Sequence, residues 1–364
     1  MNRFLAPLAF LFLLPGCLVD AMYGHLPNAV RMEPGVYALN GLNGPYDDFN
    51  AVAGPPPLLM DAFIAFASND ATRGGRFSID AGRIAVIQNP FPDRREPRPP
   101  TPTITVQRTG PFALIPSLPG NVRGPTPLVS PTAQTRDYTA DFDGRPTRSL
   151  SLNREPLPWS GGGELPEGAV WMFDSDHEGR RNLYFTDASD RVRPFSGNDA
   201  GADDAYATYD FQRHELVFCS NRSGHYRLYR CKNFNQNLNF SEWLASRDLA
   251  AGIEPMTELD AAGDSMAPFV CENALFFTSN RPGGRGGFDL YVSRRTSSGW
   301  GAPRNLQDLL PDSVQVNTAG NEFRPSVLLL GFEEKPELRL LLFSSDRPGG
   351  KGGYDLYLTS VPPF

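Results

Sequence analysis

The chain has 364 residues, of which 35 are Gly and 35 are Pro. Pro interrupts helices and central strands and Gly weakens both, so this composition excludes a fold dominated by long helices. A hydrophobic content of 40%, with 25 Phe and 12 Tyr, excludes a disordered chain. The net charge of −7, with the basic residues scattered, argues against a nucleic-acid-binding surface. What remains is an all-β fold of short strands joined by tight turns.

The N-terminal segment has the pattern of an export signal. Arg3 precedes an apolar run over residues 4–14, which is too short to span a bilayer as a mature helix. The Gly before Cys17 resembles the lipobox of bacterial lipoproteins, although Pro15 departs from that pattern. In lipoproteins this cysteine is lipidated and becomes the mature N-terminus. An ordinary secretory signal that is cut nearby is the alternative.

We therefore predict a lipoprotein signal peptide at residues 1–16 and a lipidated N-terminus with a linker at residues 17–35. Because Leu18 rather than Asp follows the cysteine, the resemblance implies an anchor in the outer membrane. No later segment approaches 18 apolar residues, so the lipid is the expected membrane contact.

Three further cysteines are present at Cys219, Cys231 and Cys271. They allow at most one internal disulfide, for which Cys219 and Cys231 are candidates because they flank a short predicted hairpin. The sequence leaves this pairing open.

Internal repeats indicate the architecture. Five segments share a template in which Phe-x-Ser is followed by a polar residue and a turn, and four of them continue into a Leu-Tyr strand. The template Ser lies at Ser68, Ser175, Ser220, Ser279 and Ser345. The last three spacings are 45, 59 and 66 residues and the first is 107, so a degenerate unit is expected near residues 137–154. This predicts six units, or five if residues 137–188 form one unit with a long insertion.

Each unit has the pattern of a strand, a hairpin and a second strand. Continuous apolar runs at residues 216–218, 274–277 and 340–343 are typical of strands that are covered on both faces. A unit of about 55 residues with roughly four strands is the size of a propeller blade. We predict an all-β propeller domain at residues 36–364, with six blades or five, closed by an N-terminal strand near residues 36–39. An open β-solenoid array is the alternative.

The repeat resembles the WD-like repeat of the TolB-like β-propeller family, over about residues 45–364 and more strongly after residue 165. The Pro-Gly-Gly-x-Gly-Gly-[Phe/Tyr]-Asp-Leu-Tyr form at residues 282–291 and 348–357 is similar to repeats of envelope proteins that also carry a peptidoglycan-binding domain, which we do not expect here. The resemblance implies a propeller that faces the periplasm and binds other envelope proteins without catalysis.

Two sets of residues recur at fixed positions of the repeat. The hairpin signature consists of Ser220, Arg222, Ser279, Arg281, Asp289, Ser345, Arg347 and Asp355. We predict that the arginine and the aspartate of the last two hairpins, Arg281 with Asp289 and Arg347 with Asp355, form bidentate pairs that brace them.

The second set is acidic and precedes the blades. It consists of Asp47, Asp48, Asp203, Asp204, Asp264 and Glu322. Closure of the propeller would place these acids on one face around the central channel. They are either ordinary turn residues that hydrogen-bond to nearby backbone, or an acidic rim that recruits a basic partner segment or a cation.

The sequence shows no convincing catalytic or metal motif. Asp174, Asp176, His177 and Glu178 look like a metal cluster, but the repeat register makes them turn residues. The two Gly-rich hairpins lack the Lys-Ser/Thr pair of a phosphate loop, and neither H-E-x-x-H nor G-x-S-x-G occurs. A Ser-His-Asp set assembled through space is left open. We therefore expect no enzyme activity, no cofactor and no metal.

These observations predict a lipid-anchored envelope propeller that acts as a protein–protein interaction scaffold at the outer membrane, on a side that the sequence leaves open. Its expected partners are other envelope proteins, and nucleic acid is not expected. The alternative is a propeller enzyme or a glycan-binding module with its site at the channel mouth. The Pro-rich stretch at residues 88–165 would then hold the specialised site; otherwise it forms long loops between strands.

Overall fold

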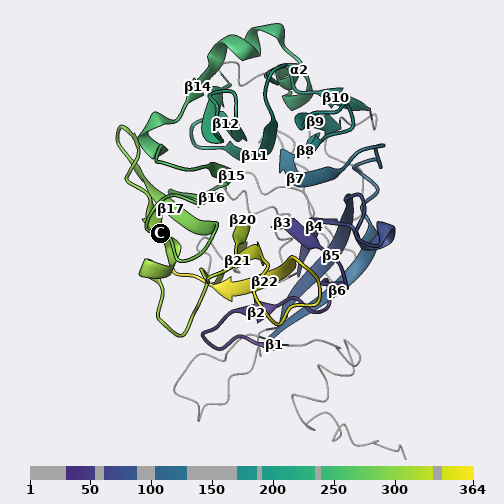
Figure 1. The fold of residues 1–364 in the computed structure, drawn as a ribbon, viewed down its shortest axis with the longest axis vertical. Coiled ribbons are helices and arrows are strands. Elements are labelled where there is room, and N and C mark those ends of the chain that lie inside the picture. Colours follow the sequence, from purple (N-terminus) through teal and green to yellow (C-terminus); the bar gives the residue numbers. More distant parts are fainter. Residues whose placement is uncertain are drawn as a thin grey trace, which may run out of the picture.

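The computed structural model describes residues 30–53, 61–87, 103–128, 170–186, 191–233, 239–330 and 338–364. These residues form five antiparallel sheets arranged around a common axis (Figure 1). The prediction of an all-β propeller is therefore confirmed. Cys17 and the predicted signal peptide lie outside the described residues.

The first two blades come from the N-terminal half of the chain. Blade 1 contains β3 (Asp48–Ala53), β4 (Asp61–Ser68), β5 (Ser78–Ile87) and β6 (Thr103–Pro111), with β1 (Val30–Arg31) paired to β6. Blade 2 contains β7 (Val122–Leu128), β8 (Val170–Ser175), β9 (Asn182–Thr186) and β10 (Val192–Pro194).

The other three blades follow in chain order. Blade 3 contains β11 (Asp204–Asp210), β12 (Glu215–Ser220), β13 (Arg227–Lys232) and β14 (Ile253–Pro255). Blade 4 contains β15 (Ser265–Cys271), β16 (Ala274–Ser279) and β17 (Asp289–Thr296), with β18 (Gly299–Trp300) and β19 (Arg304–Asn305) both paired to β17. Blade 5 contains β20 (Glu322–Leu330), β21 (Leu338–Ser345), β22 (Asp355–Ser360) and β2 (Tyr37–Ala38), so it combines strands from both ends of the chain.

Short helical segments lie in the connections between strands. They are η1 (Asp70–Thr72), α2 (Phe240–Leu244), η3 (Arg247–Gly252), η4 (Thr257–Leu259) and η5 (Leu306–Leu309). In the described part of the chain, none of the helices has the length and apolar content that a membrane span requires.

The ring closes with five blades in the described residues. The innermost strands β3, β7, β11, β15 and β20 contact one another in this order, and β20 also contacts β3. The six-blade prediction is therefore wrong and the five-blade alternative is right. The extra unit was expected near residues 137–154, which fall between β7 and β8 in the sequence and lie outside the described residues.

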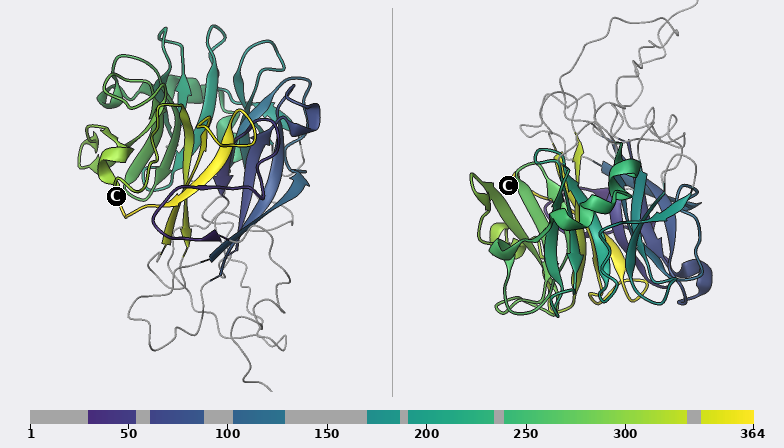
Figure 2. Two further views of the ribbon diagram at one scale, coloured as in Figure 1. Left: turned by 60° about the horizontal axis from the view of Figure 1, so that its bottom comes forward. Right: turned by 90° about the horizontal axis from the view of Figure 1, so that it is seen from above.

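The three apolar runs of the sequence lie in β12, β16 and β21, which are the second strands of blades 3, 4 and 5. Every residue of β12 and β16 is buried, as the runs predict. The Pro-rich stretch at residues 88–165 contains β6 and β7, which are regular blade strands that the repeat analysis missed. Figure 2 shows the hairpins that join the second and third strands gathered at one end of the propeller, here called the hairpin face.

Candidate functional site

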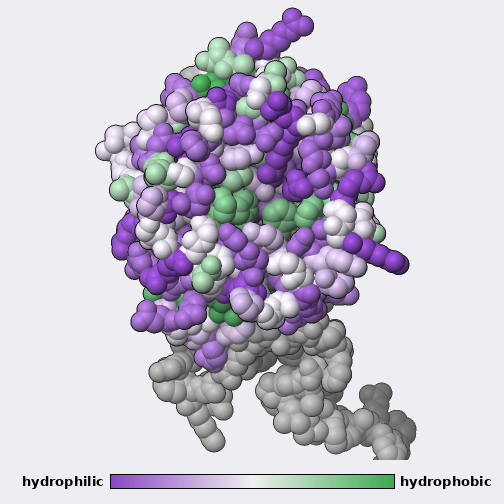
Figure 3. Space-filling view, in the orientation of Figure 1, coloured by the Kyte–Doolittle hydropathy of each residue, from purple (hydrophilic) through white to green (hydrophobic). Residues whose placement is uncertain are grey.

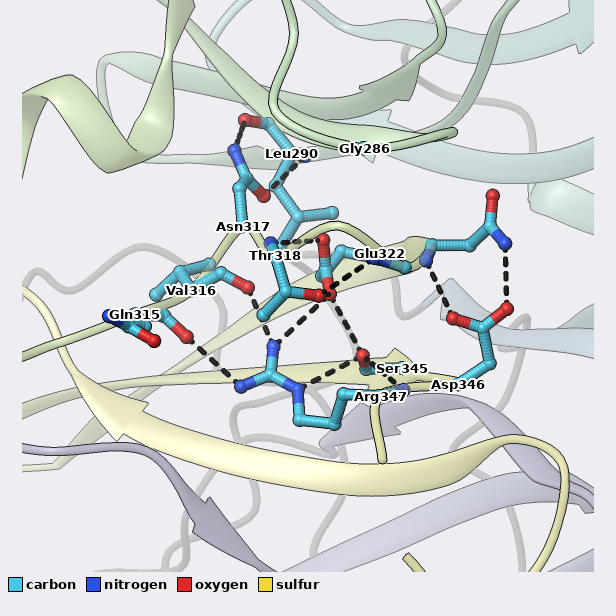
Figure 4. A network of polar contacts seen from close by, with 12 residues as sticks. Gly286, Leu290, Gln315, Val316, Asn317, Thr318, Glu322, Ser345, Asp346 and Arg347 are labelled. Atoms are coloured by element: carbon cyan, nitrogen blue, oxygen red, sulfur yellow. Dashed lines mark hydrogen bonds and ion pairs between the residues drawn. The ribbon is translucent and has the colours of Figure 1, made fainter. Parts of the chain in front are cut away.

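In blades 3, 4 and 5, the signature arginine attaches the hairpin to the inner strand of its own blade. In blade 5, Arg347 Nε donates to Ser345 Oγ at 3.0 Å and Nη2 lies 3.3 Å from Glu322 Oε1 (Figure 4). The guanidinium lies over the rings of Phe343 and Tyr357, at 5.2 and 4.7 Å from their centroids. Cation–π contact and charge-assisted hydrogen bonding therefore act on the same side chain.

The same arrangement recurs in blades 3 and 4. Arg222 Nε donates to Ser220 Oγ at 2.9 Å and its Nη2 lies 2.6 Å from Asp204 Oδ1. In blade 4, Arg281 Nη2 donates to Ser265 Oγ at 3.2 Å, because Ser occupies the position of the acid. We call this contact between the signature arginine and the first inner-strand residue the arginine latch.

The predicted pairs of Arg281 with Asp289 and of Arg347 with Asp355 are wrong. Each aspartate instead accepts hydrogen bonds from the backbone of its own Gly-rich turn, as Asp355 Oδ2 does from the N–H of Lys351 at 2.6 Å. The arginines extend the other way and form the latches.

The Gly-rich turns also let neighbouring blades approach closely. A Cβ atom on Gly286 would lie 2.2 Å from the carbonyl oxygen of Gly320, and one on Gly352 would lie 1.6 Å from that of Tyr46. Both contacts are with the loop that begins the next blade. The second Gly pair of each hairpin is therefore required by packing between blades.

One Asp or Asn before each inner strand links it to the preceding blade. Its Oδ1 accepts the backbone N–H of the residue that precedes the third strand of the preceding blade. Its own N–H donates to the side chain of the residue that follows the template Ser in its own blade. The five links are Asp47 with Tyr354 (2.8 Å), Asn121 with Phe77 (3.0 Å), Asp203 with Arg181 (3.2 Å), Asp264 with Tyr226 (2.9 Å) and Asn321 with Phe288 (3.0 Å). We call these five residues the linker ring.

The six acids of the predicted rim thus have two different environments. Asp47, Asp203 and Asp264 belong to the linker ring and stay partly exposed. The other three, Asp48, Asp204 and Glu322, are fully buried. Each of these three lies beside an arginine, which for Asp48 is Arg108 at 3.4 Å. Burial raises the pKa of Asp48 to about 6 and also raises that of Glu322.

Blades 1 and 2 replace the latch with other residues, which explains why their repeats are faint. In blade 1, Arg108 of the outer strand β6 donates to Ser68 Oγ at 2.7 Å. In blade 2, His177 takes the place of the arginine, with Nδ1 3.1 Å from Ser175 Oγ, and Val122 takes the place of the acid. The sequence could not identify Arg108, because it lies 40 residues beyond the template Ser.

Aromatic side chains gather around the channel on the hairpin face. They are Phe49, Phe77, Phe288, Phe323 and Tyr354, here called the mouth aromatics. Phe49 lies 5.1 Å from Phe77 and 5.6 Å from Tyr354 between ring centroids, and Phe288 lies 5.7 Å from Phe323. All are partly exposed except Phe323, which is 9% exposed. Figure 3 shows apolar side chains at the centre of this face, where Figure 1 places β3 and β20.

Below the mouth aromatics, side chains from the inner-strand bulges fill the channel. Each inner strand has one residue with a positive φ at its bulge: Asn50, Gly124, Tyr206, Ala267 and Arg324. Arg324 Nη2 crosses the channel to donate to Thr126 Oγ1 at 2.7 Å. A Cβ atom on Gly124 would lie 2.9 Å from the ring of Tyr206, so Gly124 makes room for that ring. The repeat analysis missed these residues because their types differ from blade to blade.

The candidate metal residues serve other contacts. Asp174 Oδ2 lies 2.6 Å from Arg181 Nε, and Asp176 Oδ1 accepts the N–H of Asn121 at 2.6 Å. Within the described ranges, no three His, Cys, Asp or Glu side chains group so that they could hold a metal ion. Cys219 and Cys231 are both free. Burial raises the pKa of each thiol to about 12.

No protein-family model matches the chain, and the search of curated proteins found no match. Among solved structures, the chain is similar to TolB from Acinetobacter baumannii (12% identity, 95% of this chain and 68% of that one, TM-score 0.32). It is also similar to a putative TolB from Agrobacterium tumefaciens (9%, 92% and 99%, TM-score 0.37) and to an exo-β-1,3-galactanase from Phanerochaete chrysosporium (10%, 92% and 64%, TM-score 0.47). The propeller assignment rests on the chain's own five sheets.

Proposed function

We propose that this protein is a lipid-anchored scaffold of the cell envelope, which binds another envelope protein at the mouth of its channel and performs no catalysis. The observation that supports the proposal most is the cluster of mouth aromatics. Partly exposed aromatic rings gathered in one place supply large contact areas at a small entropic cost, and they are enriched where proteins bind one another. The anchor is the lipid expected on Cys17.

Three of the five linker-ring residues are acidic. Asp47, Asp203 and Asp264 are partly exposed, and one oxygen of each accepts a backbone N–H group. The same position is Asn in blades 2 and 5, so the hydrogen bond itself does not require a charge. The three carboxylates therefore favour a partner segment that carries Lys or Arg beside apolar side chains.

The alternative is a propeller enzyme or a glycan-binding module that uses the same mouth. Aromatic rings can also pack against the apolar faces of other ligands, so the mouth aromatics alone do not separate a protein partner from a glycan. The two hypotheses differ in what intact envelopes yield. We expect a scaffold to be crosslinked to a defined protein, and a glycan binder, or an enzyme that acts on a glycan, to yield none.

The test is crosslinking in intact envelopes followed by mass spectrometry. We expect the wild type to capture one defined envelope protein and Phe288→Ala to capture much less of it. Phe211→Ala is the matched control. Phe211 is also partly exposed, but it follows the end of β11 that lies away from the hairpin face. If no protein is recovered, the alternative is favoured; if Phe288→Ala captures as much as the wild type, the mouth is not the site.

A second set of variants tests the charge of the linker ring. The combined change of Asp47, Asp203 and Asp264 to Asn keeps an acceptor at each position and removes three charges. We expect the thermal midpoint to stay close to that of the wild type, while capture weakens and loses its salt dependence. Unchanged capture would show that these carboxylates serve the fold alone.

A further inference from the structure

Arg324 is a fully buried cation at the centre of the propeller. It occupies the bulge of β20, with φ 50°, and its Nη2 donates to Thr126 Oγ1 at 2.7 Å and contacts the carbonyl oxygen of Ala207 at 3.4 Å. Its Nε and Nη1 are shielded from solvent and have no hydrogen-bond partner. No carboxylate among the described residues forms an ion pair with it, unlike the arginines of blades 1, 3 and 5.

The charge around Arg324 is not balanced. Two guanidinium groups contact the ring of Tyr206, that of Arg181 at 4.1 Å and that of Arg324 at 5.4 Å. Arg181 is neutralised by Asp174 at 2.6 Å. Burial lowers the pKa of Arg324 to about 10, which still leaves it protonated at neutral pH. One positive charge therefore remains without a counter-ion in a region of low dielectric constant, where an unpaired charge is costly.

We propose that Arg324 is the anion-binding residue of a site in the middle of the channel that takes a small carboxylate. A carboxylate carries one negative charge, which balances the single excess positive charge, and its oxygens accept the N–H groups of guanidinium. This site is independent of the scaffold function, because it needs no protein partner. The ligand is either a free carboxylate or one that a larger molecule carries into the channel.

The carboxylate enters from the hairpin face and meets Tyr206 first. The ring of Tyr206 lies 5.6 Å from that of Phe323, between the mouth aromatics and the guanidinium. Its hydroxyl accepts a long hydrogen bond from Asn50 Nδ2 at 3.4 Å and also a hydrogen bond from the Arg181 side chain. Rotation of Tyr206 away from the axis gives up these hydrogen bonds and its cation–π contacts, and the ion pair between the carboxylate and the Arg324 guanidinium replaces them. It also releases Asn50 Nδ2, a second donor for the carboxylate.

The test uses acetate as the probe and the thermal midpoint of the full chain as the readout. We expect sodium acetate to raise the midpoint of the wild type in a saturable way, compared with sodium chloride at the same ionic strength. The Arg324→Gln variant should lose this difference. Arg281→Gln is the matched control and should keep it, because Arg281 belongs to the arginine latch of blade 4. An equal rise in both salts, or the same acetate effect in Arg324→Gln, would overturn the proposal.

A crystal of the wild type soaked in acetate gives a second measurement that does not depend on a variant being able to fold. Density for acetate within hydrogen-bonding distance of Arg324 Nε or Nη1 would support the site. A soaked crystal in which Tyr206 still covers both nitrogens would contradict it. A larger ligand that carries the carboxylate would be distinguished by competition, because it would displace acetate while also protecting the mouth aromatics from solvent.

Discussion

Asp47 Oδ1 accepts a hydrogen bond from the backbone N–H of Tyr354 at 2.8 Å, across 307 residues of sequence. Asp47 belongs to the linker ring, and this bond joins the first blade to the last. The backbone adds a parallel bond, from the N–H of Asp48 to the carbonyl oxygen of Tyr354 at 2.8 Å. The propeller is therefore closed by the same link that joins the blades at each of the remaining four junctions.

Replacing Asp47 with Ala should destabilise the closed ring. The substitution leaves the N–H of Tyr354 without its acceptor, which costs about 1–3 kcal/mol of unfolding free energy when the donor is shielded from water. Asp47→Asn keeps the acceptor and should stay within about 1 kcal/mol of the wild type. Urea unfolding of both variants measures the difference. Equal losses in the two variants would mean that the charge, rather than the hydrogen bond, is what stabilises closure.

Removing the arginine latch of blade 5 should be more damaging. Arg347→Met leaves Glu322 buried beside Ser345 and Thr318 without its cation, and an uncompensated buried charge costs about 3–5 kcal/mol. Glu322→Gln in the same chain removes that charge and should restore part of the loss. A double-mutant cycle measures the coupling between Arg347 and Glu322. A coupling energy near zero would show that the two side chains act independently.

The raised pKa of Asp48 predicts how stability changes with pH. Its folded-state pKa, about 6, lies above the usual range for Asp, so the folded protein binds this proton more tightly than the unfolded chain does. The contribution of Asp48 to stability is therefore fully present below about pH 4 and is lost as pH rises through about 6.

Asp48→Asn should remove this contribution, because Asn stays neutral at every pH. We expect the unfolding free energy of the variant, relative to that of the wild type, to increase between pH 4 and pH 7. Chemical unfolding at several pH values measures this difference. A difference that stays constant with pH would show that Asp48 is not the group that titrates.

The blades of the C-terminal half could be predicted because their signals are local. Ser279, Arg281 and the Gly pairs of 283–287 lie within one hairpin, so turn chemistry and apolar strands identify it directly. The first two blades gave weaker signals because their latch residues differ. Arg108 comes from an outer strand in blade 1, and His177 replaces the arginine in blade 2.

The candidate site was only partly predictable. The sequence identified the acids at the start of the inner strands, but not that Asp204 is buried beside Arg222 while Asp203 stays partly exposed. The mouth aromatics and Arg324 were not identified, because neighbours in the channel come from different blades. Such neighbours share no spacing in the sequence.

The sequence by itself determined that the protein is built from repeated β-hairpins and that Gly and Pro have different roles in it. Much of the Gly supports regular hairpins such as 283–287 and 349–353, while many of the Pro residues lie in 88–165, where the repeat is faint. Only the tertiary structure decided the number of blades and the partner of each arginine. Blade number depends on how sheets pack side by side, and Arg347 meets Glu322 across 25 residues because the inner strand of the same sheet lies beside the hairpin.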